Sequence, residues 1–183
     1  HASDQPSMNE STHSRKTGAP VKVLMVCLGN ICRSPTAEGV LRALIAEAGL
    51  DGVIEVDSAG TSDWHRGEPP DHHSQRAAAA RGYDLSTLKS RPVVADDFLL
   101  HDYILAMDEQ NLRDLHSFCP PHLHEKLGLL LEYGELDCTD VPDPYTLDGA
   151  AFDHVIDLCE HACKELLQQL IEIHQLVPSG RMR

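Results

Sequence analysis

Short apolar runs alternate with longer amphipathic stretches along most of the chain. Four apolar runs have the length and composition of buried strands, at residues 21–26, 53–56, 103–107 and 127–131. Apolar positions with helical spacing fill the segments between and after them, at residues 35–47, 72–81, 109–115 and 149–176. Strands that alternate with helices in this way predict an α/β domain with a parallel sheet and right-handed crossovers.

The first helix carries end signals in its sequence. Pro35 suits the first turn of a helix, and Ser34 before it is a good N-cap. Gly49, after the last apolar position, predicts the end of the helix. Ligands of parallel sheets bind at the carboxyl ends of strands, so the segment between the first strand and this helix is a candidate site.

The domain boundaries follow from where the periodicity begins and ends. Residues 1–20 are rich in Ser, Thr, Asn and Asp and have no apolar period, which predicts a flexible tail. A chain of 183 residues has the size of one domain, and no internal repeat is evident. We therefore expect a single domain over residues 21–177 and a short C-terminal tail over residues 178–183.

Composition narrows the range of partners and compartments. The formal net charge is −14, which argues against nucleic acid and against an anionic membrane as partners. We expect no membrane span and no secretory leader, because no stretch has the required apolar length. The six cysteines fit no extracellular disulfide framework in a chain of this size, so we expect reduced thiols and a cytoplasmic location.

The densest candidate chemistry lies in residues 26–35, V-C-L-G-N-I-C-R-S-P, between the first strand and the first helix. Backbone N–H groups in such a loop can converge on an anion, and the helix dipole favours negative charge there. Cys27 in that field would ionise easily and act as a nucleophile, and the guanidinium of Arg33 fits two phosphoryl oxygens at once. Gly29 lets the backbone approach an anion closely, and Asn30 tolerates a left-handed conformation. Taken alone, Cys27 would more often be a buried structural thiol, but its neighbours favour the nucleophile.

The run C-L-G-N-I-C-R-S at residues 27–34 resembles the signature loop C-x5-R-S of the low-molecular-weight protein tyrosine phosphatases. Further matches follow in family order: D-S-A-G-T at residues 57–61, Trp64, A-M-D at residues 106–108 and D-P-Y at residues 143–145. The resemblance covers roughly residues 21–177. It implies a flavodoxin-like fold, a four-stranded parallel sheet with helices on both faces.

The resemblance also implies roles for individual residues. Cys27 would attack phosphorus and form a phosphocysteine, while Arg33 and the other loop residues bind the substrate. Those loop residues are Leu28, Gly29, Asn30, Ile31, Cys32 and Ser34. Asp143 would protonate the leaving phenolate and then activate water. Without the resemblance, Asp143-Pro144 is equally consistent with an ordinary turn.

Two further positions have both a structural and a functional interpretation. Trp64 and Tyr145 would form aromatic walls for a phosphotyrosine ring, although a lone tryptophan more often packs. Cys32 is either a small packed side chain or a partner that captures oxidised Cys27 as a disulfide. The resemblance favours redox regulation through Cys32.

We expect neither a metal nor a cofactor. The twelve histidines have no carboxylate or cysteine partners at ligand spacing, and Cys159 and Cys163 share the apolar face of the last helix. Relatives often carry a histidine after the second helix that supports the signature loop. The nearest counterpart here is Thr87, so the support of the loop must differ.

These observations predict a cytoplasmic, metal-independent phosphatase that acts on phosphotyrosine in proteins or on small aryl phosphates. A thiol-dependent arsenate reductase on the same fold is the nearest alternative, but it needs extra redox cysteines and does not need D-P-Y. A protein-arginine phosphatase is a second, but those relatives tend to carry threonine where this chain has Ile31. A third is an anion-binding or redox-sensing module without turnover.

Overall fold

The structure, a computed structural model, describes residues 18–145 and 147–178. The predicted N-terminal tail lies outside the described residues except for residues 18–20. The predicted C-terminal tail lies outside them except for residue 178. Within the described part, the expected alternation of strands and helices is present.

The core of the fold is a four-stranded parallel sheet in the order β2-β1-β3-β4. The strands are β1 (Val21–Cys27), β2 (Ile54–Gly60), β3 (Tyr103–Ala106) and β4 (Leu127–Leu129). β1 is hydrogen-bonded on both edges, which explains why its sequence is a continuous apolar run. The predicted flavodoxin-like α/β class is confirmed.

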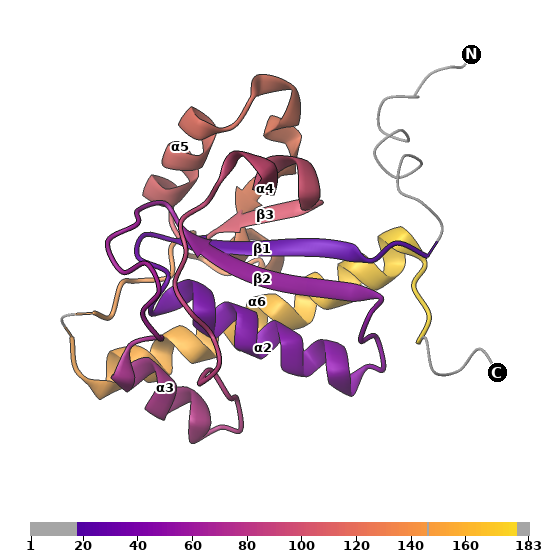
Figure 1. Cartoon of the computed structure of the whole chain (residues 1–183). Coiled ribbons are helices and arrows are strands. Elements are labelled where there is room, and N and C mark those ends of the chain that lie inside the picture. Colours follow the sequence, from indigo (N-terminus) through magenta and orange to yellow (C-terminus); the bar gives the residue numbers. More distant parts are fainter. Residues whose placement is uncertain (1–17, 146, 179–183) are drawn as a thin grey trace, which may run out of the picture.

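Helices cover both faces of the sheet, as Figure 1 shows. They are α2 (Arg33–Glu47), α3 (His72–Ala79), α4 (Ala95–Leu100), α5 (Glu109–Phe118) and α6 (Gly149–His174), with short 3-10 turns η1 (Pro121–Lys126) and η2 (Leu130–Gly134). α2 and α6 cover one face and α4 and α5 the other (Figure 1). Among the described residues no helix combines the length and the apolar composition needed to cross a bilayer.

Alternate residues of β1 enter the two layers of the core. Val23, Met25 and Cys27 belong to the cluster formed with α2 and α6. Leu24 and Val26 belong to the cluster formed with α4 and α5. The thiol of Cys27 therefore lies on the α2 and α6 side, where α2 begins.

Several predicted boundaries are wrong. β2 continues to Gly60, inside a predicted loop, because it pairs residue for residue with β1 as far as Cys27. The last strand ends at Leu129, and residues 130–134 turn into η2. Ser34 is not the N-cap: α2 begins at Arg33 and the N-cap is Cys32. The hydroxyl of Ser34 contacts the thiol of Cys27 instead.

The crossovers create a crevice at the carboxyl end of the sheet. The chain leaves β1 toward α2 on one face and leaves β3 toward α5 on the other (Figure 1). Such a switch point leaves room for a ligand beyond the strand ends. Cys27 ends β1 and Asp108 follows β3, so both lie at this crevice.

Candidate active site

The sulfur of Cys27 receives hydrogen-bond donors from its own loop. Cys27 is 2% exposed, and the N–H of Asn30 points at its Sγ from 3.3 Å. The Oγ of Ser34 lies 3.0 Å from the same sulfur. A competing acceptor for that hydroxyl, the carbonyl oxygen of Ala59, is farther away at 3.4 Å. Donors that converge on sulfur stabilise a thiolate over a thiol.

Asn30 fixes the shape of residues 27–33, named here the 27–33 loop. Its backbone is left-handed, with φ of 58°, as the sequence suggested for an asparagine. Its buried Nδ2 donates to Ser34 Oγ at 2.8 Å and to Ser58 Oγ at 2.9 Å. Its Oδ1 accepts the N–H of Arg91 at 3.0 Å. Every polar atom of this amide is thus paired, which leaves the loop one conformation.

Arg33 joins the loop to two distant segments. The guanidinium is buried and donates to Asp108 Oδ2 at 2.6 Å and to the carbonyl of Val141 at 3.1 Å. Its Nη2 lies 3.8 Å from Asp143 Oδ2. Burial alone would lower the pKa of Arg33, but Cys27 and Asp108 outweigh it and raise the pKa. Arg33 therefore stays charged beside the sulfur.

The loop that carries Asp143 is anchored at its base. Val141 donates its N–H to Met107 O at 2.7 Å, directly beside the end of β3. Asp140 accepts the N–H of Glu109 at the start of α5, at 3.0 Å. Asp143 itself is half-exposed, and its Oδ1 accepts the N–H of Tyr145 at 3.1 Å. This turn holds the carboxyl group of Asp143 over the 27–33 loop.

These segments enclose a pocket of about 120 Å³. Its lining residues are Cys27, Leu28, Gly29, Ile31, Cys32, Arg33, Trp64, His65, Asp143 and Tyr145. All predicted site residues line it except two, Asn30 and Ser34, whose buried side chains turn inward and bond to each other. Those two side chains support the loop from behind.

The outer wall of the pocket includes a residue that the sequence analysis missed. Trp64 and Tyr145 are exposed at 71% and 52%, and His65 also lines the pocket, with its ring centroid 6.1 Å from that of Tyr145. Glu68 holds His65 through Nδ1 at 2.9 Å. A Cβ on Gly29 would come within 3.0 Å of the His65 ring, so Gly29 makes room for this wall. His65 was missed because the histidines were considered only as metal ligands. The signal that could have indicated it is its position directly after Trp64.

The second loop cysteine is in a different environment from the first. Cys32 is buried, and it packs with Ile31 and Phe152. Burial raises the pKa of its thiol to about 12, and the neighbouring Asp71 and Cys27 act in the same direction. Cys32 therefore remains a neutral thiol next to Cys27, and both are free.

Other candidate ligands do not form a metal site. Across residues 18–145 and 147–178, no group of three or more His, Cys, Asp or Glu side chains is placed to hold an ion. Cys159 and Cys163 are fully buried in the core, as predicted, and burial raises the pKa of both thiols. Thr87 is exposed, and side-chain and backbone groups of Ser90 and Arg91 contact the loop instead.

Comparison with known proteins is consistent with this geometry. The family model described as low molecular weight phosphotyrosine protein phosphatase matches residues 22–176. A putative low molecular weight protein-tyrosine-phosphatase of Synechocystis is 44% identical over 152 residues, which are 82% of this chain and 96% of that protein. The crystal structure of YfkJ from Bacillus subtilis is 39% identical, with a TM-score of 0.82 over 88% of this chain and 100% of that one. A protein tyrosine phosphatase from Entamoeba histolytica, solved with Hepes in its active site, is 40% identical, with a TM-score of 0.81 over 85% and 99% of the two chains.

The contact between Ser34 and Cys27 predicts how a hydroxyl deletion changes the thiol. Ser34→Ala removes a donor 3.0 Å from Sγ, so alkylation of Cys27 by iodoacetamide at mildly acidic pH should slow about tenfold or more. Ser62→Ala is the matched control, because the Ser62 hydroxyl bonds the carbonyl of Leu28 at 3.0 Å without touching the sulfur. Equal alkylation rates for the two variants, measured by mass spectrometry of the loop peptide, would contradict the donor role of Ser34.

Proposed function

Since the chain belongs to the low molecular weight phosphotyrosine protein phosphatase family and is thus a protein tyrosine phosphatase, we propose that Cys27 is its nucleophile and that hydrolysis runs through a phosphocysteine. The observation that carries this proposal is the convergence of three groups in one pocket. The sulfur of Cys27, the guanidinium of Arg33 and the carboxyl group of Asp143 all line it. No pair of them is adjacent in sequence.

In the first step the thiolate of Cys27 attacks phosphorus in line with the phenolic oxygen. The S–P bond forms, the P–O bond to the phenol breaks, and Asp143 gives its proton to the departing oxygen. Arg33 and the loop N–H groups hold the equatorial oxygens, where charge is concentrated. In the second step Asp143, now a carboxylate, takes a proton from water as the water attacks phosphorus. The S–P bond breaks, and inorganic phosphate and the thiolate are released.

The depth of the pocket favours aryl phosphates. The sulfur of Cys27 is almost completely buried, whereas Trp64 and Tyr145 are exposed at the rim. A tyrosine ring is long enough to place its phosphate at the sulfur while its faces contact these aromatic walls. A serine side chain is too short to do both. We therefore propose a phosphotyrosine-bearing protein or a small aryl phosphate as substrate.

Features of the site and of the chain also bear on the alternatives and on location. An arsenate reductase needs further redox thiols at the site, and of the six cysteines Cys32 alone joins Cys27 in lining this pocket. Ile31 lines the pocket at the position expected for a filter against phosphoarginine.

All six cysteines are free thiols, which supports our proposal of a reducing, cytoplasmic location.

A substrate panel tests the proposed activity. The protein should hydrolyse phosphotyrosine far faster than phosphoserine or phosphoarginine, and it should not reduce arsenate. Cys27→Ser should abolish turnover yet still bind vanadate, because the loop N–H groups and Arg33 remain. A chelator should leave the rate unchanged. Turnover by Cys27→Ser would exclude Cys27 as nucleophile, and binding without turnover by the parent would favour an anion-binding module.

The acid role of Asp143 should be visible through the leaving group. A phenolate of high pKa needs a proton as it departs, whereas a nitrophenolate leaves without one. Asp143→Ala should therefore slow formation of the phosphocysteine by about a hundred- to ten-thousand-fold for phosphotyrosine and much less for para-nitrophenyl phosphate. Pre-steady-state bursts with a series of aryl phosphates measure this. Asp140→Ala, which loosens the same loop, is the control. Equal slowing across the series would mean that Asp143 only shapes the loop.

We also propose that Cys32 protects the nucleophile from irreversible oxidation. Peroxide oxidises the Cys27 thiolate to a sulfenic acid, and the sulfur of Cys32 then displaces water to form a disulfide, which thiols reduce. Mild peroxide should inactivate the enzyme reversibly and yield a linked peptide by mass spectrometry. Cys32→Ser should be active but recover poorly, whereas Cys138→Ser, at an exposed cysteine, should recover like the parent. Full recovery of Cys32→Ser would refute the protection.

A further inference from the structure

A short segment after α3 supports the 27–33 loop from outside the pocket. This segment, residues 90–93, forms a parallel bridge with Gly60 at the end of β2. Ser90 Oγ donates to the carbonyl of Gly29 at 2.9 Å. The N–H of Arg91 donates to Asn30 Oδ1 at 3.0 Å. Two consecutive residues of the segment thus contact two consecutive residues of the loop.

The bond from Arg91 sets the direction of a hydrogen-bond chain that ends at the nucleophile. Because Asn30 Oδ1 accepts the N–H of Arg91, the Nδ2 group must face the hydroxyls of Ser34 and Ser58. Ser34 then accepts from Asn30, so its own proton is available for the sulfur of Cys27. With the amide reversed, both serines would donate to Oδ1, and two donors would face each other at Arg91.

A matching constraint acts at the other serine. Ser58 donates its proton to Glu38 Oε1 at 2.6 Å, so it too can only accept from Asn30. The two ends of the amide are therefore held by different parts of the chain. Glu38 of α2 fixes the Nδ2 end, and the backbone of Arg91 fixes the Oδ1 end.

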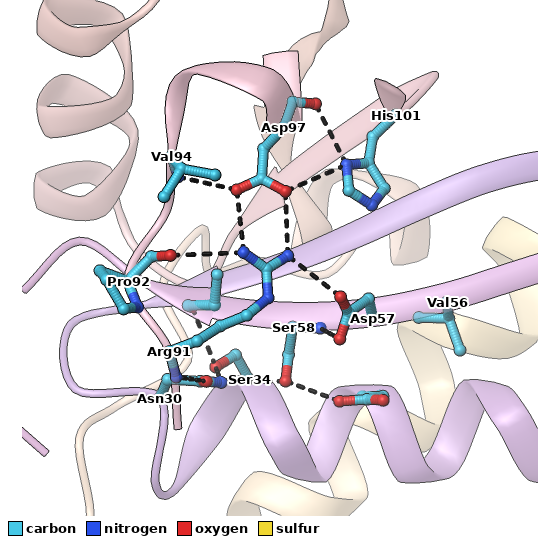
Figure 2. Close-up of polar contacts among 12 residues, drawn as sticks. Asn30, Ser34, Val56, Asp57, Ser58, Arg91, Pro92, Val94, Asp97 and His101 are labelled. Carbon is cyan, nitrogen blue, oxygen red and sulfur yellow. Dashed lines mark hydrogen bonds and ion pairs between the residues drawn. The ribbon is translucent and has the colours of Figure 1, made fainter. Parts of the chain in front are cut away.

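The side chain of Arg91 anchors its own backbone. Figure 2 shows that the guanidinium donates two hydrogen bonds to the carboxylate of Asp97 and one to that of Asp57. The bidentate contacts with Asp97 measure 3.0 and 2.9 Å, and the contact with Asp57 measures 3.0 Å. Asp97 is buried and also accepts the N–H of Val94 at 2.8 Å at the start of α4. Burial would raise the pKa of Asp97, but Arg91 and the Val94 N–H overcome it and lower the pKa. The anchor thus ties the segment to α4 and to β2.

We propose that Arg91 is a positioning residue for the reaction. Asp97 and Asp57 bind its guanidinium, which keeps its backbone N–H hydrogen-bonded to Asn30 Oδ1. This bond orients the amide of Asn30 and so directs the hydroxyl proton of Ser34 toward the sulfur of Cys27. This inference rests on the proposed function in taking Cys27 as the nucleophile. Arg91 carries one positive charge and its two partners carry two negative charges, so a direct electrostatic benefit to an anionic substrate is not the basis of the effect. The effect comes from the orientation of the Asn30 amide and the Ser34 hydroxyl.

The test is a set of substitutions read out at the thiol. Arg91→Met should slow alkylation of Cys27 by iodoacetamide at mildly acidic pH about tenfold. It should also lower kcat for para-nitrophenyl phosphate more than it raises KM. Arg91→Lys keeps the charge but loses the planar fork, so it should resemble Arg91→Met more than the parent. In a Ser34→Ala background, Arg91→Met should have little further effect on alkylation, because both changes act on one hydroxyl.

Arg81→Met is the matched control. Arg81 also binds two carboxylates, Asp157 at 2.8 Å and Glu160 at 3.2 Å, and its side-chain exposure of 30% is close to the 32% of Arg91. It contacts α6 and not the loop. Its loss should lower the melting temperature without changing alkylation or kcat. If Arg91→Met does not fold, Asp57→Ala removes one contact of the anchor and should give a smaller change in the same direction.

Two outcomes would overturn the proposal. Arg91→Met could lower the melting temperature as Arg81→Met does while alkylation stays at the parent rate, or its effect could add fully to that of Ser34→Ala. Either would make Arg91 a merely structural residue. Failure of the proposed function looks different, because turnover by Cys27→Ser would be seen in a protein whose Arg91 is intact.

Discussion

The turn from β1 into α2 depends on the side-chain amide of Asn30. A left-handed backbone is unfavourable for any residue with a Cβ, and here two buried hydrogen bonds and one partly buried hydrogen bond offset that cost. A glycine could adopt the same φ but would leave Ser34, Ser58 and the Arg91 N–H without their partner. The amide therefore sets the path of the loop and the protonation pattern around the sulfur of Cys27 at the same time.

The proposed phosphate site lies in an acidic protein, so phosphate binding there must rely on short-range interactions. A net charge of −14 repels a phosphate dianion at a distance, and Arg33 already shares its charge with Asp108. Directional donors do not depend on the long-range field: the loop N–H groups and the guanidinium of Arg33 act only at hydrogen-bond distance. This arrangement favours a ligand that fits the loop closely over anions in general.

One loop holds two thiols with opposite environments. The sulfur of Cys27 receives an N–H and a hydroxyl, whereas Cys32 packs among Ile31 and Phe152, where burial raises its pKa to about 12. Ionisation at Cys32 is further opposed by the proximity of Cys27 itself. The difference between the two thiols thus comes from packing and hydrogen bonding, since the residue type is the same.

The sequence alone determined the elements whose cause is local. The apolar run of β1, the spacing of the long last helix and the composition of the 27–33 loop follow from periodicity and residue chemistry. They were sufficient to predict the parallel sheet with flanking helices and to select Cys27 and Arg33 as candidate site residues. Asp143, Trp64 and Tyr145 were identified only through family resemblance, because nothing in their local sequence links them to the loop. The tertiary structure alone decided that β2 extends to Gly60 and that Ser34 bonds to a thiol and does not cap α2. It also decided that His65 lines the pocket wall. Finally, it showed that Arg91 contacts the 27–33 loop and that Asp108 binds Arg33. Each of these depends on how the chain folds, because strand pairing, the path of the 27–33 loop and its contacts with distant segments exist only once the chain has folded.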